Sequence, residues 1–122
     1  MIRAGRGADA DRVLSDGLER LATDPRTRMP GEVALWHYKR GTARVAAGRA
    51  ADARADLGGA IDPGAGGRNW VKGRAHLELG RLAQNEGNRA AARDHLQTAI
   101  RLCTSDRDAL GAEQARALLN AR

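Results

Sequence analysis

Apolar residues recur along most of this chain at intervals of three and four, which is the spacing of one face of an α-helix. Leu14, Leu18 and Leu21 form one such stripe, and Leu96 and Ala99 belong to another. No segment alternates apolar and polar residues over the length of a strand. The pattern therefore predicts an all-α protein.

Prolines and glycines divide the chain into about six helical segments. They cluster at 24–31 and across 62–67, and Gly48 lies between two apolar-periodic runs. Because these residues favour turns and end helices, we expect each cluster to be a connection. The predicted helices are 9–23, 31–47, 50–61, 69–85, 88–102 and 106–120.

Polar residues at three of the predicted starts suggest helix N-caps. Asn69 and Asn88 each precede an apolar run, and Asn88 follows a glycine. Ser105 and Asp108 have the spacing of a capping box, with Asp in place of the usual Glu or Gln. Side chains of these types accept hydrogen bonds from the first free N–H groups of a helix, so we expect all three to act as caps.

The chain also contains an internal repeat. A shift of 39 residues aligns 34–63 with 73–102 and gives nine identical pairs, including two glycine pairs with one common separation. A glycine inside the first helix allows a partner helix to approach, and a second glycine turns the chain between the two. The predicted unit is an αα-hairpin that stacks on the next one. The identical pairs are His37/His76, Gly41/Gly80, Gly48/Gly87, Ala51/Ala90, Ala53/Ala92, Arg54/Arg93, Leu57/Leu96, Ala60/Ala99 and Ile61/Ile100.

These residues resemble the tetratricopeptide repeat family, which has Leu-Gly in its first helix, a turn glycine, and small and bulky apolar residues on its second helix. Residues 73–102 match with Leu79-Gly80, Gly87 and the stripe that contains Leu96. Residues 34–63 keep the glycines but have Arg40 in place of the leucine and Arg44 in place of the second aromatic.

The resemblance implies a single helical domain over 1–122, an α-solenoid of antiparallel helix pairs. Residues 31–63 are the first repeat and 69–102 the second. Residues 9–23 are a half-repeat or N-terminal helix, and 106–120 are a capping helix. Two alternatives stay open: one end of a longer array, or a domain that contains a half-repeat.

Charge and composition argue against nucleic acid as the main ligand. The chain has 21 basic and 15 acidic residues, for a net charge of +6, but acidic residues occur in every predicted helix. Single-strand recognition usually adds exposed aromatic stacking platforms, and Trp36, Tyr38 and Trp70 are the only aromatics. We interpret most of the charge as solvated helix surface.

The same composition bears on the compartment. Cys103 is the only cysteine, which excludes an internal disulfide and suits a reducing compartment. No apolar run approaches the ~20 residues of a membrane span, and the arginines near the N-terminus precede no apolar stretch of a signal peptide. We expect a cytoplasmic protein without membrane contact.

No group of residues predicts catalysis, a metal site or a cofactor. His37 and His76 occupy equivalent repeat positions, so we expect them to pack between helices. His95 has no Cys, Asp or Glu at zinc-type spacing, and no HExxH motif occurs. Cys103 near a helix C-terminus lacks the positive environment of a reactive thiol. The sequence predicts no enzyme.

The family resemblance implies a ligand site on the concave surface that the first helix of each pair forms. Spacings of three, four and seven keep the candidate residues of each helix on one face. Arg54 and Arg93 fall on the second helices, away from this groove. The candidate lining is Leu35, Tyr38, Thr42 and Val45 from the first repeat and Arg74, Leu77, Arg81, Gln84 and Asn85 from the second.

The leading hypothesis is a non-catalytic module that binds a peptide segment of another protein. Arg74 and Arg81 would favour a partner with acidic groups, although a solvated role for both is the alternative. From a different class, the chain would be a structural or regulatory segment of a longer solenoid or multidomain protein. A homo-oligomer is compatible with either hypothesis.

Overall fold

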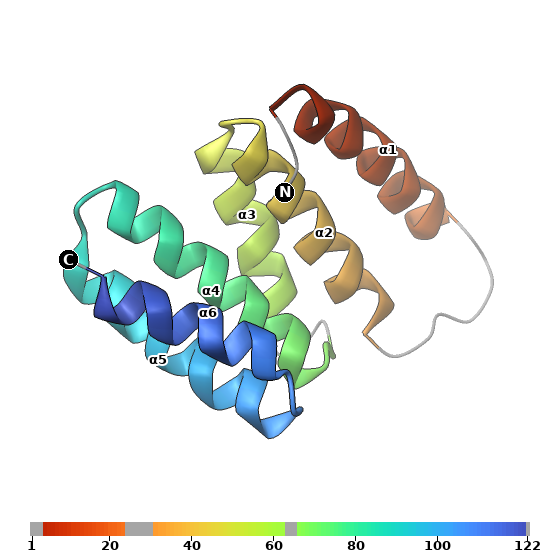
Figure 1. Cartoon of the computed structure of the whole chain (residues 1–122). Helices are drawn as coiled ribbons and strands as arrows, with labels where there is room; N and C mark the ends of the chain where they lie inside the picture. Colours follow the sequence, from red (N-terminus) through yellow and green to blue (C-terminus); the bar gives the residue numbers. More distant parts are fainter. Residues whose placement is uncertain (1–3, 24–30, 63–65, 122) are drawn as a thin grey trace. The chain divides into compact units, whose positions relative to one another are not determined.

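The computed structural model describes residues 4–23, 31–62 and 66–121, and within them the chain forms helices and no strand. The all-α prediction is confirmed. Two of the six helices have the predicted bounds, whereas α1 begins five residues earlier than expected. The helices are α1 (Ala4–Thr23), α2 (Glu32–Ala46), α3 (Ala50–Ile61), α4 (Asn69–Asn85), α5 (Arg89–Ser105) and α6 (Ala109–Asn120) (Figure 1).

The chain divides into two compact units, 1–67 and 68–122. In the first unit, α2 packs against both α1 and α3. In the second unit, α5 packs against α4 and α6, and α6 also contacts α4. The division falls at the Gly-rich stretch that the sequence predicts as the connection between the two repeats.

One contact recurs in the α2–α3 pair and the α4–α5 pair. A Cβ atom on Gly41 would lie 2.8 Å from Leu57 Cδ2, and one on Gly80 would lie 2.8 Å from Leu96 Cδ2. Both leucines are 0% exposed. Each glycine therefore leaves the space that the leucine of the opposite helix fills, as the repeat alignment predicts.

The three short connections between helices share one backbone conformation. Gly48 and Gly87 both have φ of +78°, and Arg107 has φ of +59° at the corresponding place between α5 and α6. In each turn an amide bonds a carbonyl five residues earlier, which is the outer bond of the Schellman motif. These bonds are Arg49 N to Arg44 O at 2.8 Å, Asn88 N to Ala83 O at 2.9 Å and Asp108 N to Cys103 O at 2.8 Å.

The predicted caps have mixed outcomes. Asn88 caps α5 as expected, because its side chain accepts a hydrogen bond from Ala91 N at 3.2 Å. The cap predicted at Asn69 is wrong: this residue is the first of α4 and makes no side-chain cap. The N–H of Trp70 instead donates to Asp106 Oδ2, at 2.8 Å, beyond the end of α5. A neighbouring chain segment thus replaces the local cap.

The capping box predicted at Ser105 and Asp108 is also wrong. Ser105 lies in the last turn of α5, which runs three residues further than predicted. Asp108 is itself the N-cap of α6, and its side chain accepts from Gly111 N at 3.2 Å. The spacing identified the right aspartate in the wrong role.

The left-handed turns give a first prediction. Gly87→Ala should lower the free energy of unfolding by about 1–2 kcal/mol, because an alanine at positive φ brings its Cβ against the following carbonyl. No other atom lies within 4 Å of that Cβ, so the cost is in the backbone. Arg107→Gly should instead raise the free energy of unfolding, by less than about 1 kcal/mol. Glycine adopts the positive φ without strain, but it loses more backbone entropy on folding, which offsets part of the gain. Urea unfolding of both variants measures this, and a destabilised Arg107→Gly variant would contradict it.

Candidate functional site

The four candidate groove residues on α2 share a partly buried setting. Leu35, Tyr38, Thr42 and Val45 are all intermediate in exposure. The Thr42 hydroxyl donates to the Tyr38 carbonyl at 3.0 Å, within the same helix. These residues belong to the first unit, whereas the α4 candidates belong to the second. A groove that spans both units therefore stays a prediction.

Helix α6 contacts the face of α4 that carries the other candidates. Leu77 is 2% exposed and forms a cluster with Leu96 and Ala99 of α5 and with Ala115 of α6. Leu118 also packs against this cluster. Leu77 thus contributes to the core of the second unit and not to an accessible surface.

Arg74 forms a two-pronged ion pair with Asp108. Its Nε lies 2.6 Å from Asp108 Oδ2 and its Nη2 lies 2.7 Å from Oδ1. The hydrogen bonds from Arg74 hold the pKa of Asp108 below its ordinary value. Since Asp108 also caps α6, Arg74 links the middle of α4 to the start of α6.

The remaining α4 candidates differ in exposure. Arg81 is 41% exposed, and its Nε lies 3.5 Å from Glu78 Oε2. Burial raises the pKa of Glu78, although the charge of Arg81 opposes this. Gln84 Nε2 donates to the Leu118 carbonyl at 2.7 Å, so it too contacts α6. Asn85 is exposed at the end of the helix.

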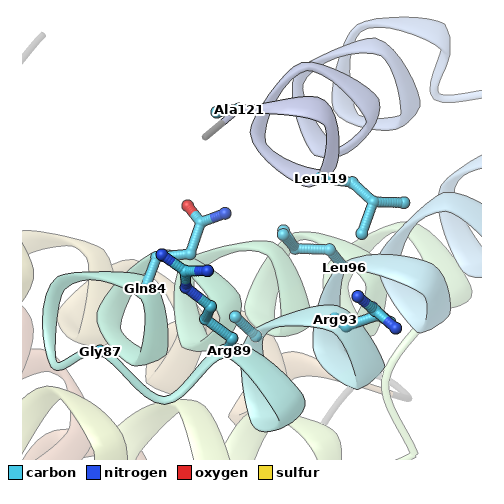
Figure 2. Close-up of a pocket in the computed structure, with 8 residues that line it drawn as sticks. Gln84, Gly87, Arg89, Arg93, Leu96, Leu119 and Ala121 are labelled. Carbon is cyan, nitrogen blue, oxygen red and sulfur yellow. The ribbon is translucent and has the colours of Figure 1, made fainter.

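A cavity of about 720 Å³ lies beside these contacts, between the start of α5 and the end of α6. Figure 2 shows Arg89 and Arg93 on α5, with Leu119 on α6 above Leu96. Arg93 is a residue that the sequence placed away from the binding surface. The lining comprises Gln84, Gly87, Arg89, Ala92, Arg93, Leu96, Leu119 and Ala121.

The two arginines of the cavity differ from Arg74 in their contacts. Arg89 and Arg93 are exposed and stand one helical turn apart. Neither forms an ion pair or hydrogen bond within the part of the chain that the structure describes. The cavity therefore combines an apolar wall, in which Leu119 is partly exposed and Ala92 and Leu96 lie buried behind the surface, with two available guanidinium groups.

The first unit contains a buried ionic cluster. Asp56 of α3 is 2% exposed and accepts hydrogen bonds from Arg40, Arg44 and His37 of α2 at 2.7 to 2.9 Å. Burial alone would raise the pKa of Asp56, but the hydrogen bonds from Arg40 and His37 outweigh it and lower the pKa. The carboxylate is thus ionised and fully paired, which is the condition for burying it.

A second carboxylate extends this cluster to α1. Asp11 is 3% exposed and accepts from Arg44 Nε at 3.0 Å and from Arg49. The cluster is not among the features predicted from the sequence. The signal was present, because Arg40 and Arg44 both replace apolar residues of the family pattern and stand one turn apart. Each binds Asp56, which makes the cluster a link between helices.

The two repeat histidines each contact the second helix of their own pair. His37 Nδ1 lies 2.9 Å from Asp56 Oδ1. At the equivalent place, His76 Nδ1 lies 2.9 Å from His95 Nδ1, with ring centroids 5.2 Å apart. Burial, and then the charges of His95 and Arg101, lower the pKa of His76 to about 4. Burial likewise lowers the pKa of His95.

Three further observations concern chemistry. Burial, and then the charge of Asp108, raise the pKa of the Cys103 thiol to about 11, so the thiolate nucleophile is suppressed. Across 4–23, 31–62 and 66–121, no three His, Cys, Asp or Glu side chains form a group that could hold a metal. Among the described helices, none has the length and apolar character to cross a membrane.

A scan against protein-family models gives no match to this chain, and searches of curated proteins and of solved structures also give none. The likeness to tetratricopeptide repeats rests on the residues quoted above and stays a prediction. The candidate site is accordingly defined by the geometry of the second unit.

The contrast between Arg74 and Arg81 gives a second prediction. Arg74→Ala should lower the free energy of unfolding by roughly 1.5–3 kcal/mol, because it removes two hydrogen bonds to a charged, mostly buried partner. Arg81→Ala should cost only about 0–1 kcal/mol, because its 3.5 Å contact with Glu78 is long and makes no hydrogen bond. Urea unfolding of the two variants makes the comparison, and equal losses would show that the Arg74 pair does not link α4 to α6.

The neutral His76–His95 pair gives a third prediction, a loss of stability in mild acid. An unfolded histidine binds its proton near pH 6.5, whereas His76 in the folded chain has a pKa of about 4. Between these values the unfolded chain binds more protons, so the free energy of unfolding falls as the pH falls. Urea unfolding across about pH 4 to 7 measures the slope. His76→Gln should flatten it, and an unchanged slope in this variant would contradict the assignment.

Proposed function

We propose that this protein is a non-catalytic interaction module and that its second unit binds a peptide segment of another protein in the cavity beside α5 and α6. The observation that carries this proposal is the pairing of an apolar wall with two available arginines. An aliphatic side chain fits against the partly exposed Leu119, and a neighbouring carboxylate fits Arg89 or Arg93. The expected ligand is a segment in which acidic and aliphatic residues are neighbours.

Gln84 supports a peptide as the ligand. A carbonyl can only accept a hydrogen bond, so the amide nitrogen of Gln84 must face Leu118 O. Its Oε1 then remains at the wall of the cavity as an acceptor, and a peptide N–H is a suitable donor. The cavity thus offers complements to three features of a peptide: backbone N–H, aliphatic side chain and carboxylate.

Electrostatics would set the specificity of this binding more than its strength. Exposed ion pairs contribute only about 0–1 kcal/mol each, whereas complementary charges speed association and exclude other partners. The net charge of +6 favours an acidic partner over the whole surface. The partly exposed stripe of Leu35, Tyr38, Thr42 and Val45 on α2 is a proposed additional contact for a longer ligand.

Selection of displayed random peptides against the full chain tests the proposal, and this is the fourth prediction. Enriched peptides should carry Asp or Glu next to Leu or a similar residue, and their binding should weaken with added salt. The double variant Arg89→Glu/Arg93→Glu should lose this binding because its charge at the cavity is reversed. Arg101→Glu/Arg116→Glu, which changes exposed arginines outside the cavity lining, is the charge-matched control and should retain it.

Two outcomes would contradict the proposal. Equal losses in both double variants would mean that net charge and not the cavity attracts the peptides. Absence of any enriched peptide would favour the alternative, a structural or regulatory segment of a longer protein. Circular dichroism of each variant separates these outcomes from a loss of fold.

A further inference from the structure

One side of the cavity beside α5 and α6 is a helix face. Its α5 residues, Arg89, Ala92, Arg93 and Leu96, have the spacings of three, four and seven that keep side chains on one face. They extend over about 10 Å of the helix axis, which is two turns. Ala92 and Leu96 are 3% and 0% exposed, so the two arginines are the accessible side chains of this face.

The charge of the lining is entirely positive. Within the described part of the chain it contains Arg89 and Arg93 and no Asp or Glu. The two arginines are four residues apart, so their Cβ atoms are separated by about 5–6 Å. Two carboxylates four residues apart on a ligand helix have the same spacing, and carboxylates two residues apart on a strand, at about 6–7 Å, come close to it. Charge spacing alone therefore leaves both ligand conformations open.

The hydrogen-bonding groups of the lining distinguish a helix from a strand. A strand presents N–H and C=O groups along its whole length and binds best to a sheet edge that pairs with them. The described cavity walls are helices, and the amide oxygen of Gln84 is the only side-chain acceptor among the lining residues that the structure describes. A helix bonds its own N–H groups except those of its first turn. One acceptor at one end of the cavity meets that requirement.

We propose that the ligand of this cavity is an acidic amphipathic helix that binds with its first turn at Gln84 and its axis along α5. This inference rests on the proposed function and specifies the conformation and direction of the ligand. Gln84 stands at the end of the cavity where α5 begins, beside Arg89 (Figure 2). The first acidic residue of the ligand then pairs with Arg89, and the second, four residues later, pairs with Arg93. An acidic residue in the first turn also complements the dipole of the ligand helix.

A second copy of this chain does not supply the required pattern. Within the described helices, Asp52 and Asp56 are the only acidic residues that lie four apart in one helix. Asp56 is 2% exposed and already accepts hydrogen bonds from Arg40 and Arg44. The helix that fits the cavity therefore belongs to a different protein.

The displayed peptides selected against the full chain test this inference, and this is the fifth prediction. Their acidic residues should lie four apart, and circular dichroism should show that a synthetic peptide of the enriched sequence gains helix on binding. The same peptide with its second acidic residue moved to lie two after the first is the matched control. It should bind roughly two- to fivefold more weakly, because one exposed ion pair is lost.

Exchange of charges tests the direction of the helix. Arg89→Glu should weaken binding, and a peptide with arginine in place of its first acidic residue should restore it. Arg93→Glu should be restored by arginine in place of the second acidic residue. The crossed combinations are controls and should stay weak. Restoration in the matched combinations shows that each variant is folded.

Several results would overturn this inference and leave the proposed function intact. They are acidic residues at another spacing, binding without a gain of helix, and any other pattern of restoration. Absence of enriched peptides would overturn both. Sedimentation of the chain alone provides a separate check. Self-association that Arg89→Glu/Arg93→Glu abolishes would assign the cavity to a second copy and would also overturn the inference.

Discussion

The close approach of helices at glycine is the constraint on which the rest of this structure depends. The chain has no Phe and only three other aromatics, so each core side chain buries little area and packing must be tight. Gly41 and Gly80 give their space to Leu57 and Leu96 in the two helix pairs. Gly7 acts similarly between α1 and α2, where a Cβ would lie 2.8 Å from the carbonyl oxygen of Ala43.

Although the two helix pairs pack in the same way, the two units have different polar residues at one corresponding repeat position. Asp56 in the first unit corresponds to His95 in the second, at the repeat spacing of 39 residues. The buried carboxylate requires Arg40 and Arg44, and a buried charge without such partners is strongly unfavourable. The second unit has Leu79 and Ala83 at the places of those arginines. A neutral imidazole is therefore compatible with this environment, whereas a carboxylate is not.

The helices and turns could be predicted because their signals are local. Apolar spacing located all six helices, and Gly48 and Gly87 marked two of the left-handed turns. The site could not be predicted in the same way. The contact of Arg74 with Asp108 joins residues 34 apart, and the sequence offered no second copy of 106–120 to compare. Periodicity identifies an apolar face, but it does not identify which neighbour covers that face.

Helix α6 couples the core of the second unit to its cavity. Leu119 packs against the core cluster and lines the cavity as well, and Leu96 belongs to both. Gln84 lines the cavity with a side chain whose nitrogen binds the end of α6. A ligand that contacts these residues would also contact the surface that holds α6 in place, so it would bind most tightly to the state with α6 docked. By linkage such a ligand stabilises the docked state, and the Arg74–Asp108 pair that positions the other end of α6 contributes to the affinity from a distance.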